Sequence, residues 1–256
     1  MRRTLAVLSL LALTACGTES ADSAENTDSG GNGGSAEQTV IVFAAASLTE
    51  AFTELGAEFE AANPGTDVTF NFGGSSALAQ QIGQGAPADV FAAASPAAMA
   101  QVPDAPSPEV FARNRLRIAV PGGNPGRITG LADFARDDAV IALCAEQVPC
   151  GAAAKAVFAA AGITPRPDTL EQDVKAALTK VRLGEVDAAL VYRTDVLAAG
   201  DEVEGLDFPE ADRAVNDYPI AALTGAPNPT GARAFVEHVR SGRGRAVLAE
   251  AGFDLP

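Results

Sequence analysis

Short apolar runs rich in β-branched residues alternate with helix-like segments from residue 40 onward. Residues 40–43 indicate a buried strand, after which Phe52, Leu55 and Phe59 recur at helical spacing. Further strands are predicted at residues 67–72, 115–120, 139–143, 186–192 and 218–223, and residues 85–91 lead into another short strand. Strands that alternate with helices in this way predict an α/β fold whose sheets are mostly parallel and flanked by helices.

Three of the predicted strands run directly into a helix start. Ser47 follows the first strand and forms a Ser-x-x-Glu capping pattern with Glu50, and Ser75 follows two glycines after the second strand. At the third junction, residues 146–151 lead into a helix at 152–161 whose start offers only backbone N–H groups. Hydroxyl and N–H groups at helix starts can bind an anion; the alternative is that each serine only caps its helix.

Two later positions lie at comparable places in the pattern. Val174 follows Asp173 at the start of another predicted helix, and the apolar residues on its helix face favour core packing for its side chain. Tyr192 ends the strand at 186–192, where a tyrosine is typical of an amphipathic rim as well as of a binding site. In open α/β sheets, ligands bind outside the carboxyl ends of the strands, which is the edge where these junctions fall.

The first residues form a targeting signal. Arg2 and Arg3 precede a short apolar run, which is too short to span a bilayer, and Leu13-Thr14-Ala15-Cys16 resembles a bacterial lipobox. We therefore expect residues 1–15 to be a lipoprotein signal peptide and Cys16 to be lipidated; the alternative is an ordinary signal peptide with an incidental cysteine. The Ser-, Gly- and acid-rich remainder of residues 16–37 is expected to be a disordered tether.

The composition excludes several classes of function. The net charge of −15 argues against a nucleic-acid partner, because phosphate backbones need a basic surface. His238 is the single histidine and falls inside a predicted helix, so neither a metal site nor a catalytic histidine is expected. The chain has no Gly-x-Ser-x-Gly motif and no P-loop Gly-Lys-Ser/Thr, so an enzymatic function has little support.

Cys144 and Cys150 are the only cysteines besides Cys16. A close pair in an extracytoplasmic protein indicates a possible disulfide, and the alternative is two small buried thiols. The remaining candidate groups at the junctions are serine hydroxyls, backbone N–H groups and a tyrosine hydroxyl, all of them neutral donors. Such a set suits a small, fully deprotonated oxyanion, because a donor-only site penalises a ligand that brings its own O–H.

Several of these stretches together resemble one family, the substrate-binding proteins of molybdate ABC transporters (ModA-like). The most specific combination is Phe43-Ala44-Ala45-Ala46-Ser47-Leu48 with Gly85-Ala86-Pro87-Ala88-Asp89. The other matching stretches are residues 72–82, 148–151, 173–174 and 190–192. They occur in the family's order and spacing from about residue 38 to the end of the chain.

The resemblance implies a two-domain periplasmic-binding-protein fold of type II, with the ligand in the cleft between the domains. We place domain 1 at residues 38–118 plus 217–256 and domain 2 at residues 119–216. The implied ligand is molybdate or tungstate, with no cofactor and no cation as a direct partner. The implied ligand-binding residues are Ser47 and Ser75 (hydroxyl and backbone), Cys150 and Val174 (backbone N–H) and Tyr192 (phenol).

The implied protein is a monomeric receptor outside the cytoplasm, anchored to the membrane by Cys16, that delivers its anion to an ABC permease and ATPase. The alternatives are a carrier for another tetrahedral oxyanion, such as sulfate or phosphate, and an extracellular sensing module. The chain also departs from the family pattern. Cys150 stands where an alanine is familiar, Gly73-Gly74 replaces a more serine-rich turn, and Arg193 could bring a positive charge to the cleft.

Overall fold

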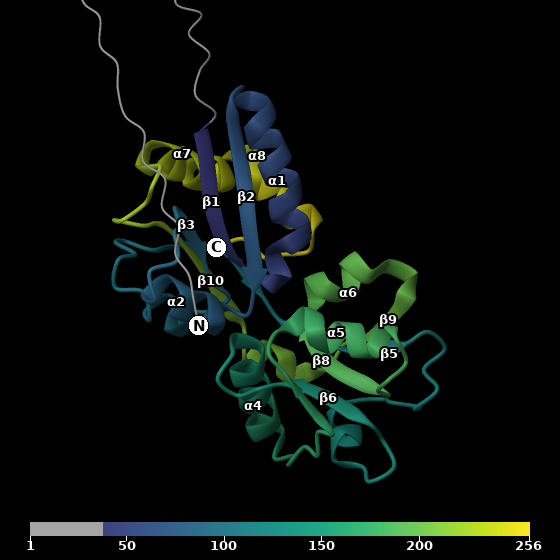
Figure 1. Cartoon of the computed structure of the whole chain (residues 1–256). Helices are drawn as coiled ribbons and strands as arrows, with labels where there is room; N and C mark the ends of the chain where they lie inside the picture. The colour runs from purple at the N-terminus through teal and green to yellow at the C-terminus, as the bar shows by residue number, and fades with distance from the viewer. Residues whose placement is uncertain (1–37) are drawn as a thin grey trace, which may run out of the picture. The chain divides into compact units, whose positions relative to one another are not determined.

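A computed structural model describes residues 38–256 of the chain (Figure 1). The predicted signal peptide at 1–15, the lipidated Cys16 and the tether at 16–37 lie outside the described residues. No helix within residues 38–256 is long and apolar enough to cross a membrane.

The strands are β1 Gln38–Ala45, β2 Thr66–Gly73, β3 Val90–Ala92, β4 Glu109–Asn114, β5 Leu116–Pro121, β6 Ile141–Cys144, β7 Thr169–Glu171, β8 Ala188–Tyr192, β9 Val203–Leu206 and β10 Asn216–Ala222. The α-helices are α1 Thr49–Ala62, α2 Ser75–Gly83, α3 Pro96–Met99, α4 Pro149–Ala161, α5 Val174–Arg182, α6 Arg193–Ala199, α7 Pro229–Arg240 and α8 Gly242–Glu250. Short 3-10 helices are η1 Ala46–Leu48, η2 Leu131–Ala135, η3 Gly200–Glu202 and η4 Pro209–Arg213.

The strands form two five-stranded sheets. The first sheet has the order β2-β1-β3-β10-β4 and the second has the order β7-β6-β8-β5-β9. In each sheet three neighbouring strands pair in parallel, namely β2-β1-β3 and β7-β6-β8. The fourth strand, β10 in the first sheet and β5 in the second, pairs antiparallel with both of its neighbours. This confirms the α/β fold class, although the sheets are more mixed than the predicted mostly parallel pattern. These two antiparallel strands, β5 and β10, are the first strands that the chain enters after each passage between the sheets.

The chain crosses from the first sheet to the second at Arg115, between β4 and β5. It returns between Leu206, the end of β9, and Asn216, the start of β10. These crossings lie close to the boundaries placed at 118/119 and 216/217 from the sequence. The division into two domains stays a prediction, with the sheets as its structural basis.

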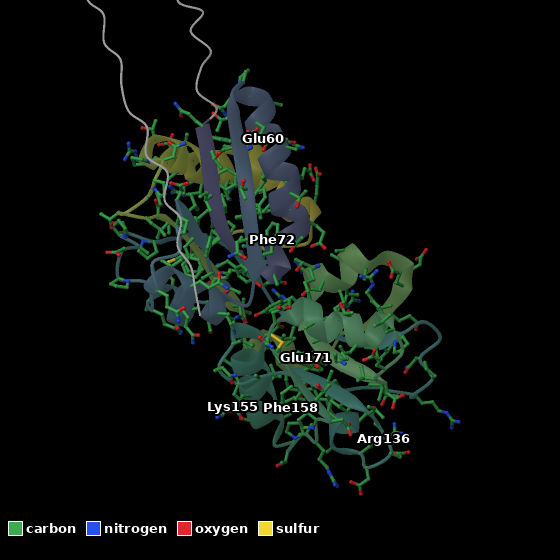
Figure 2. All side chains as sticks on the ribbon, in the orientation of Figure 1. Glu60, Phe72, Arg136, Lys155, Phe158 and Glu171 are labelled. Carbon is green, nitrogen blue, oxygen red and sulfur yellow. A yellow bond between two sulfur atoms is a disulfide. The ribbon has the colours of Figure 1, made fainter. Side chains whose placement is uncertain are left out.

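Helices cover both faces of the first sheet because its strands alternate apolar residues between the faces. Val42 and Val90 face a core shared with α1, α7 and α8, whereas Phe43 and Phe91 face a core shared with α2 and α3. The second sheet has a single core with α4 and α5. Phe158 of α4, which Figure 2 labels, packs in this core against Phe134. Each sheet is therefore a rigid platform for the loops at its strand ends.

Helices α3 and α5 each begin with a side-chain cap, whereas the capping box that the sequence predicted is absent. Ser95 caps α3, and Asp173 caps α5 by accepting a hydrogen bond from the Ala176 N–H at 2.9 Å. The capping box predicted for Ser47 and Glu50 is wrong, since α1 begins at Thr49 with no side-chain cap. Ser47 instead lies buried in η1 with its hydroxyl committed to a distant residue.

Candidate functional site

The carboxyl ends of all six parallel strands meet around one small cavity. Three strand ends of the first sheet line it: Ala45-Ala46-Ser47 at the end of β1, Gly73-Gly74-Ser75 at the end of β2, and Ala94 after β3. The second sheet contributes residues 148–150 after β6, residues 173–174 after β7, and Tyr192 at the end of β8. The cavity volume is about 20 Å³, measured as the space that the centre of a water molecule can occupy. That space accommodates one small guest and excludes a sugar or a peptide.

All five residues predicted to bind the ligand line this cavity: Ser47, Ser75, Cys150, Val174 and Tyr192. The other lining residues, which the sequence patterns did not single out as ligands, are Ala45, Ala46, Gly73, Gly74, Ala94, Val148, Pro149 and Asp173. Most of these have no functional side chain, so only their position at a strand end could have identified them.

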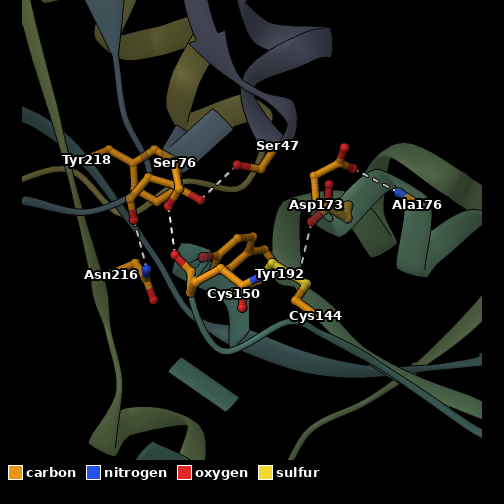
Figure 3. The surroundings of a disulfide bond; sticks show 12 residues. Ser47, Ser76, Cys144, Cys150, Asp173, Ala176, Tyr192, Asn216 and Tyr218 are labelled. Atoms are coloured by element: carbon orange, nitrogen blue, oxygen red, sulfur yellow. Dashed lines mark hydrogen bonds between the residues drawn. A yellow bond between two sulfur atoms is a disulfide. The ribbon is translucent and has the colours of Figure 1, made fainter. Parts of the chain in front are cut away.

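Each of the two serine hydroxyls forms one hydrogen bond with a residue of the first sheet or of the loop after it. Ser75 Oγ accepts the Ala94 N–H at 2.9 Å, which leaves the Ser75 hydrogen free to donate. Ser47 Oγ lies 2.8 Å from the Tyr218 hydroxyl, and either oxygen can be the donor (Figure 3). Both serines are buried, at 4% and 2% exposure, so a hydroxyl hydrogen directed at the cavity has little access to bulk water.

Two helix starts on the second sheet's side supply backbone N–H groups. Val148 is the N-cap of α4, so Cys150 lies in the first turn; Asp173 is the N-cap of α5, so Val174 is its first residue. The first N–H groups of a helix have no carbonyl partner within that helix and carry the positive end of its dipole. The side chain of Val174 packs in the core, as its pattern predicted.

A disulfide joins Cys144, at the end of β6, to Cys150, in the first turn of α4, with 5.7 Å between their Cα atoms (Figure 3). The enclosed turn is tight, because a Cβ added at Gly151 would lie 1.9 Å from the Ala145 carbonyl oxygen. Gln147 in the same turn accepts the Ser76 hydroxyl at 2.7 Å, which links the turn to α2. The disulfide therefore fixes the α4 start beside the cavity.

Tyr192 lines the cavity, and its hydroxyl forms no hydrogen bond with the described residues. Its side chain is 1% exposed, and the hydroxyl oxygen has no hydrogen-bond partner among the described residues. Burial raises the pKa of Tyr192 well above its ordinary value, and the nearby Tyr218 and Asp195 raise it further. The phenol thus keeps its proton, and its unused hydrogen is available to a guest.

The charges near the cavity are almost all neutralised. Among the described residues that line it, none is lysine or arginine, and the Asp173 carboxylate is occupied in capping α5. Arg193, which the sequence left as a possible source of positive charge, donates through Nε to the Gly252 carbonyl at 2.9 Å and pairs with Asp254 at 3.0 Å. Arg193 does not line the cavity, so it adds no positive charge to the neutral donors there.

The sequence patterns did not predict that the carboxylate of Asp195 is buried next to Tyr192. Asp195 Oδ2 accepts the Tyr192 N–H at 3.0 Å, and Lys175 Nζ lies 3.3 Å from Oδ1 without forming a well-aligned hydrogen bond. Lys175 also pairs with Glu50 of α1 at 2.6 Å. Burial raises the pKa of Asp195 to about 6, although Lys175 opposes this shift. The only signal in the sequence was its place three residues after the strand end, where an acid can cap a helix.

No group of three or more His, Cys, Asp or Glu side chains within residues 38–256 is arranged to hold a metal ion. The polar groups of the cavity can all donate hydrogen bonds, which suits an anion and not a cation. They are the Tyr192 hydroxyl, the two serine hydroxyls and the N–H groups at the helix starts. The arrangement can bind an oxyanion but presents no nucleophile paired with a base.

The raised pKa of Asp195 predicts a specific pH dependence of stability. The folded protein holds this proton more tightly than the unfolded chain, whose Asp pKa is 3.8, so Asp195 favours folding less as pH rises from about 4 to about 7. Asp195→Asn cannot titrate. The free energy of unfolding of the wild type, relative to that of the variant, should fall by about 2 kcal/mol over this range. Denaturant unfolding of both proteins at each pH measures it, and a constant difference would contradict the assignment.

Comparisons with known proteins show the family to which the chain belongs. A model of the bacterial extracellular solute-binding protein family matches residues 40–254. The chain is 41% identical over 248 residues to the molybdate-binding protein ModA of Mycobacterium bovis, covering 95% of this chain and 93% of that protein. The periplasmic molybdate-binding protein of Azotobacter vinelandii has a TM-score of 0.75 at 20% identity, covering 85% of this chain and 99% of that one.

The sulfate-binding protein SubI of Mycobacterium tuberculosis H37Rv has a TM-score of 0.72 at 17% identity, covering 85% of this chain and 87% of that one. At these identities the two solved structures show a shared fold alone. The family match confirms the prediction of a solute-binding protein and not an enzyme. On the extent of the family match and the 41% identity, the chain belongs to the bacterial extracellular solute-binding proteins and, within them, to the ModA group.

Proposed function

We propose that this protein is the extracytoplasmic receptor of a molybdate ABC transporter. It binds molybdate, and tungstate as a close analogue, in the cavity between the two sheets and delivers the anion to a membrane permease and its ATPase. Ser47, Ser75 and Tyr192 donate through their hydroxyls, and Cys150 and Val174 donate through their backbone N–H groups. Membership of the ModA group and the donor set of the cavity support this proposal.

The observation that carries the proposal is the unpartnered Tyr192 hydroxyl at the meeting point of six strand ends. A buried hydroxyl without a partner is unfavourable, and an anion in the cavity would remove that cost. Hydrogen bonds to a charged group are worth about 1.5–3 kcal/mol each. Several such bonds support tight binding of an anion without any lysine or arginine in contact with it.

Contacts across the cavity supply a means of closure around the anion. The Ser76 hydroxyl of α2 reaches the Gln147 carbonyl before α4, and Glu50 of α1 reaches Lys175 of α5. A Cβ at Gly74 would lie 2.5 Å from the Gln172 carbonyl oxygen, so the loops before α2 and α5 touch backbone to backbone. The two sheets move as separate bodies in this proposal, and these contacts form when the cleft closes.

The N-terminal segment supports attachment outside the cytoplasm. Arg2 and Arg3, the short apolar run and the lipobox ending at Cys16 are the sequence basis for a lipid anchor. We infer that residues 16–37, which lie outside the described residues, join the lipid anchor to the binding domains. A monomer fits this role, because the cavity is completed by a single chain.

A sulfate carrier is the second candidate, supported by the shared fold of SubI and by the chemistry of the cavity. Neutral N–H and O–H donors bind any deprotonated tetrahedral oxyanion, and size then selects among them. Competition between the anions separates the two proposals.

Calorimetric titration with molybdate, tungstate, sulfate and phosphate tests the proposed function. Molybdate is expected to bind with a dissociation constant of about 1 μM or lower, because five donors outweigh the cost of closure. Sulfate and phosphate should compete only at much higher concentration. Absence of molybdate binding at millimolar concentration, or a preference for sulfate, would reject the molybdate assignment.

Tyr192→Phe should affect binding and unliganded stability differently. Loss of one charge-assisted hydrogen bond weakens molybdate binding by about 1.5–3 kcal/mol, or roughly 10- to 150-fold. The unliganded variant should unfold at the same temperature as the wild type or higher, since the lost hydroxyl has no partner. Titration and thermal unfolding together measure this, and unchanged affinity would remove Tyr192 from the site.

Gly74→Ala tests closure by close backbone contact. The backbone at Gly74 has φ −62° and ψ 127°, which any residue adopts, so the effect of the methyl group is steric. Overpacking costs about 1–3 kcal/mol and should weaken molybdate binding by about 5- to 150-fold.

Gly83→Ala is the matched control at the other end of α2, since a Cβ there has no neighbour within 4 Å. It should leave the affinity unchanged in the same titration. Equal affinities for the Gly74 and Gly83 variants would show that the two loops need not touch in the bound state.

A further inference from the structure

Tyr218 lies directly behind the cavity wall without lining it. The side chain comes from β10 and is fully buried, and its ring packs edge-on against Tyr192, at a centroid distance of 6.0 Å, and against Phe253, at 5.4 Å. Its hydroxyl lies 2.8 Å from Ser47 Oγ (Figure 3). The Tyr218 side chain is therefore placed to act on a ligand only through Ser47.

The direction of this hydrogen bond follows from counting hydrogens. Each of the two hydroxyls has one hydrogen, and within residues 38–256 each oxygen forms a well-aligned hydrogen bond only with the other. If Ser47 donates, the Tyr218 hydrogen is left buried without an acceptor, which is unfavourable. If Tyr218 donates, the remaining hydrogen belongs to Ser47, which lines the cavity and can reach a guest there.

The chemistry of the two groups favours the same direction. A phenol is more acidic than an aliphatic alcohol and is therefore the better donor of the pair. Burial raises the pKa of Tyr218, so the phenol keeps this hydrogen at ordinary pH. Tyr192 and Asn114 also lie close enough to the Tyr218 hydroxyl to affect its pKa, but within residues 38–256 only Ser47 Oγ meets hydrogen-bond geometry with it.

We propose that Tyr218 is a positioning residue for anion binding: its O–H donates to Ser47 Oγ and thereby directs the Ser47 O–H into the cavity, toward an oxygen of the bound oxyanion. This inference rests on the proposed function. Tyr218 also polarises the Ser47 hydroxyl, because a hydroxyl that accepts a hydrogen bond becomes a stronger donor. The Ser47 hydrogen is thus directed at the cavity, where it favours a ligand oxygen that can accept it.

A double-mutant cycle with Tyr218→Phe and Ser47→Ala tests the inference, with molybdate titration as the readout. The phenylalanine keeps the ring contacts with Tyr192 and Phe253. Tyr218→Phe should weaken molybdate binding about 3- to 10-fold when Ser47 is present, the effect of one hydrogen bond. In the Ser47→Ala background the same substitution should change affinity less than about 2-fold, because residues that act through one group are coupled.

Ser241→Ala is the control for a general loss of stability. Ser241 caps α8 by accepting the Gly244 N–H at 3.1 Å and does not line the cavity, so this variant should lower the unfolding temperature without changing affinity. An equal loss of affinity from Tyr218→Phe in both backgrounds, or no loss in either, would overturn the inference. If the wild type itself bound no oxyanion, the proposed function would fail first and this inference with it.

A crystal structure of the wild type with molybdate gives an independent test that does not depend on any variant folding. Ser47 Oγ should lie within hydrogen-bond distance of both the Tyr218 hydroxyl and a molybdate oxygen. A Ser47 hydroxyl in contact with Tyr218 but out of reach of the anion would overturn the inference, even if molybdate occupies the cavity.

Discussion

The main physical constraint on this structure is the burial of negative charge without a neighbouring cation. A doubly charged oxyanion loses its hydration on entering a closed cavity, and this loss is acceptable only if hydrogen-bond donors replace the water. Parallel strands that lead into helices provide such donors, since each junction ends in unpaired N–H groups. The two sheets of this chain bring six junctions to one place, and no lysine or arginine lines the cavity among the described residues.

The net charge makes this local arrangement more important. At −15, the chain as a whole repels anions at long range, so binding has to rely on contacts within a few ångströms. The basic groups closest to the site are turned elsewhere: Lys175 pairs with Glu50 and Asp195, and Arg193 pairs with Asp254. These ion pairs join elements of the two sheets or anchor the chain end, and they leave the donors of the cavity neutral.

Much of the fold and the lining of the site could be predicted from the sequence, because both depend on local patterns. The alternation of strands and helices predicted the fold class, and the positions after strand ends predicted where Ser47, Ser75 and Cys150 would lie. The likeness to the ModA group added Val174, whose apolar side chain gives no sign that its N–H is available. Contacts between distant segments could not be predicted in this way, because no local pattern encodes them.

Ser47 illustrates that limit. Its Ser-x-x-Glu pattern predicted a helix cap, yet its hydroxyl pairs with Tyr218, 171 positions away, and Glu50 pairs with Lys175 of α5, a helix that packs on the other sheet. Asp195 and Gly74 are similar cases, since a buried ion pair and a close backbone approach are both products of tertiary packing.

The most direct test of the central claim is the crystal structure of the protein with molybdate bound. We expect the anion in the cavity between the sheets. Its oxygens should contact the hydroxyls of Ser47, Ser75 and Tyr192 and the N–H groups of Cys150 and Val174. An anion held mainly by lysine or arginine side chains, or bound away from this cavity, would contradict it.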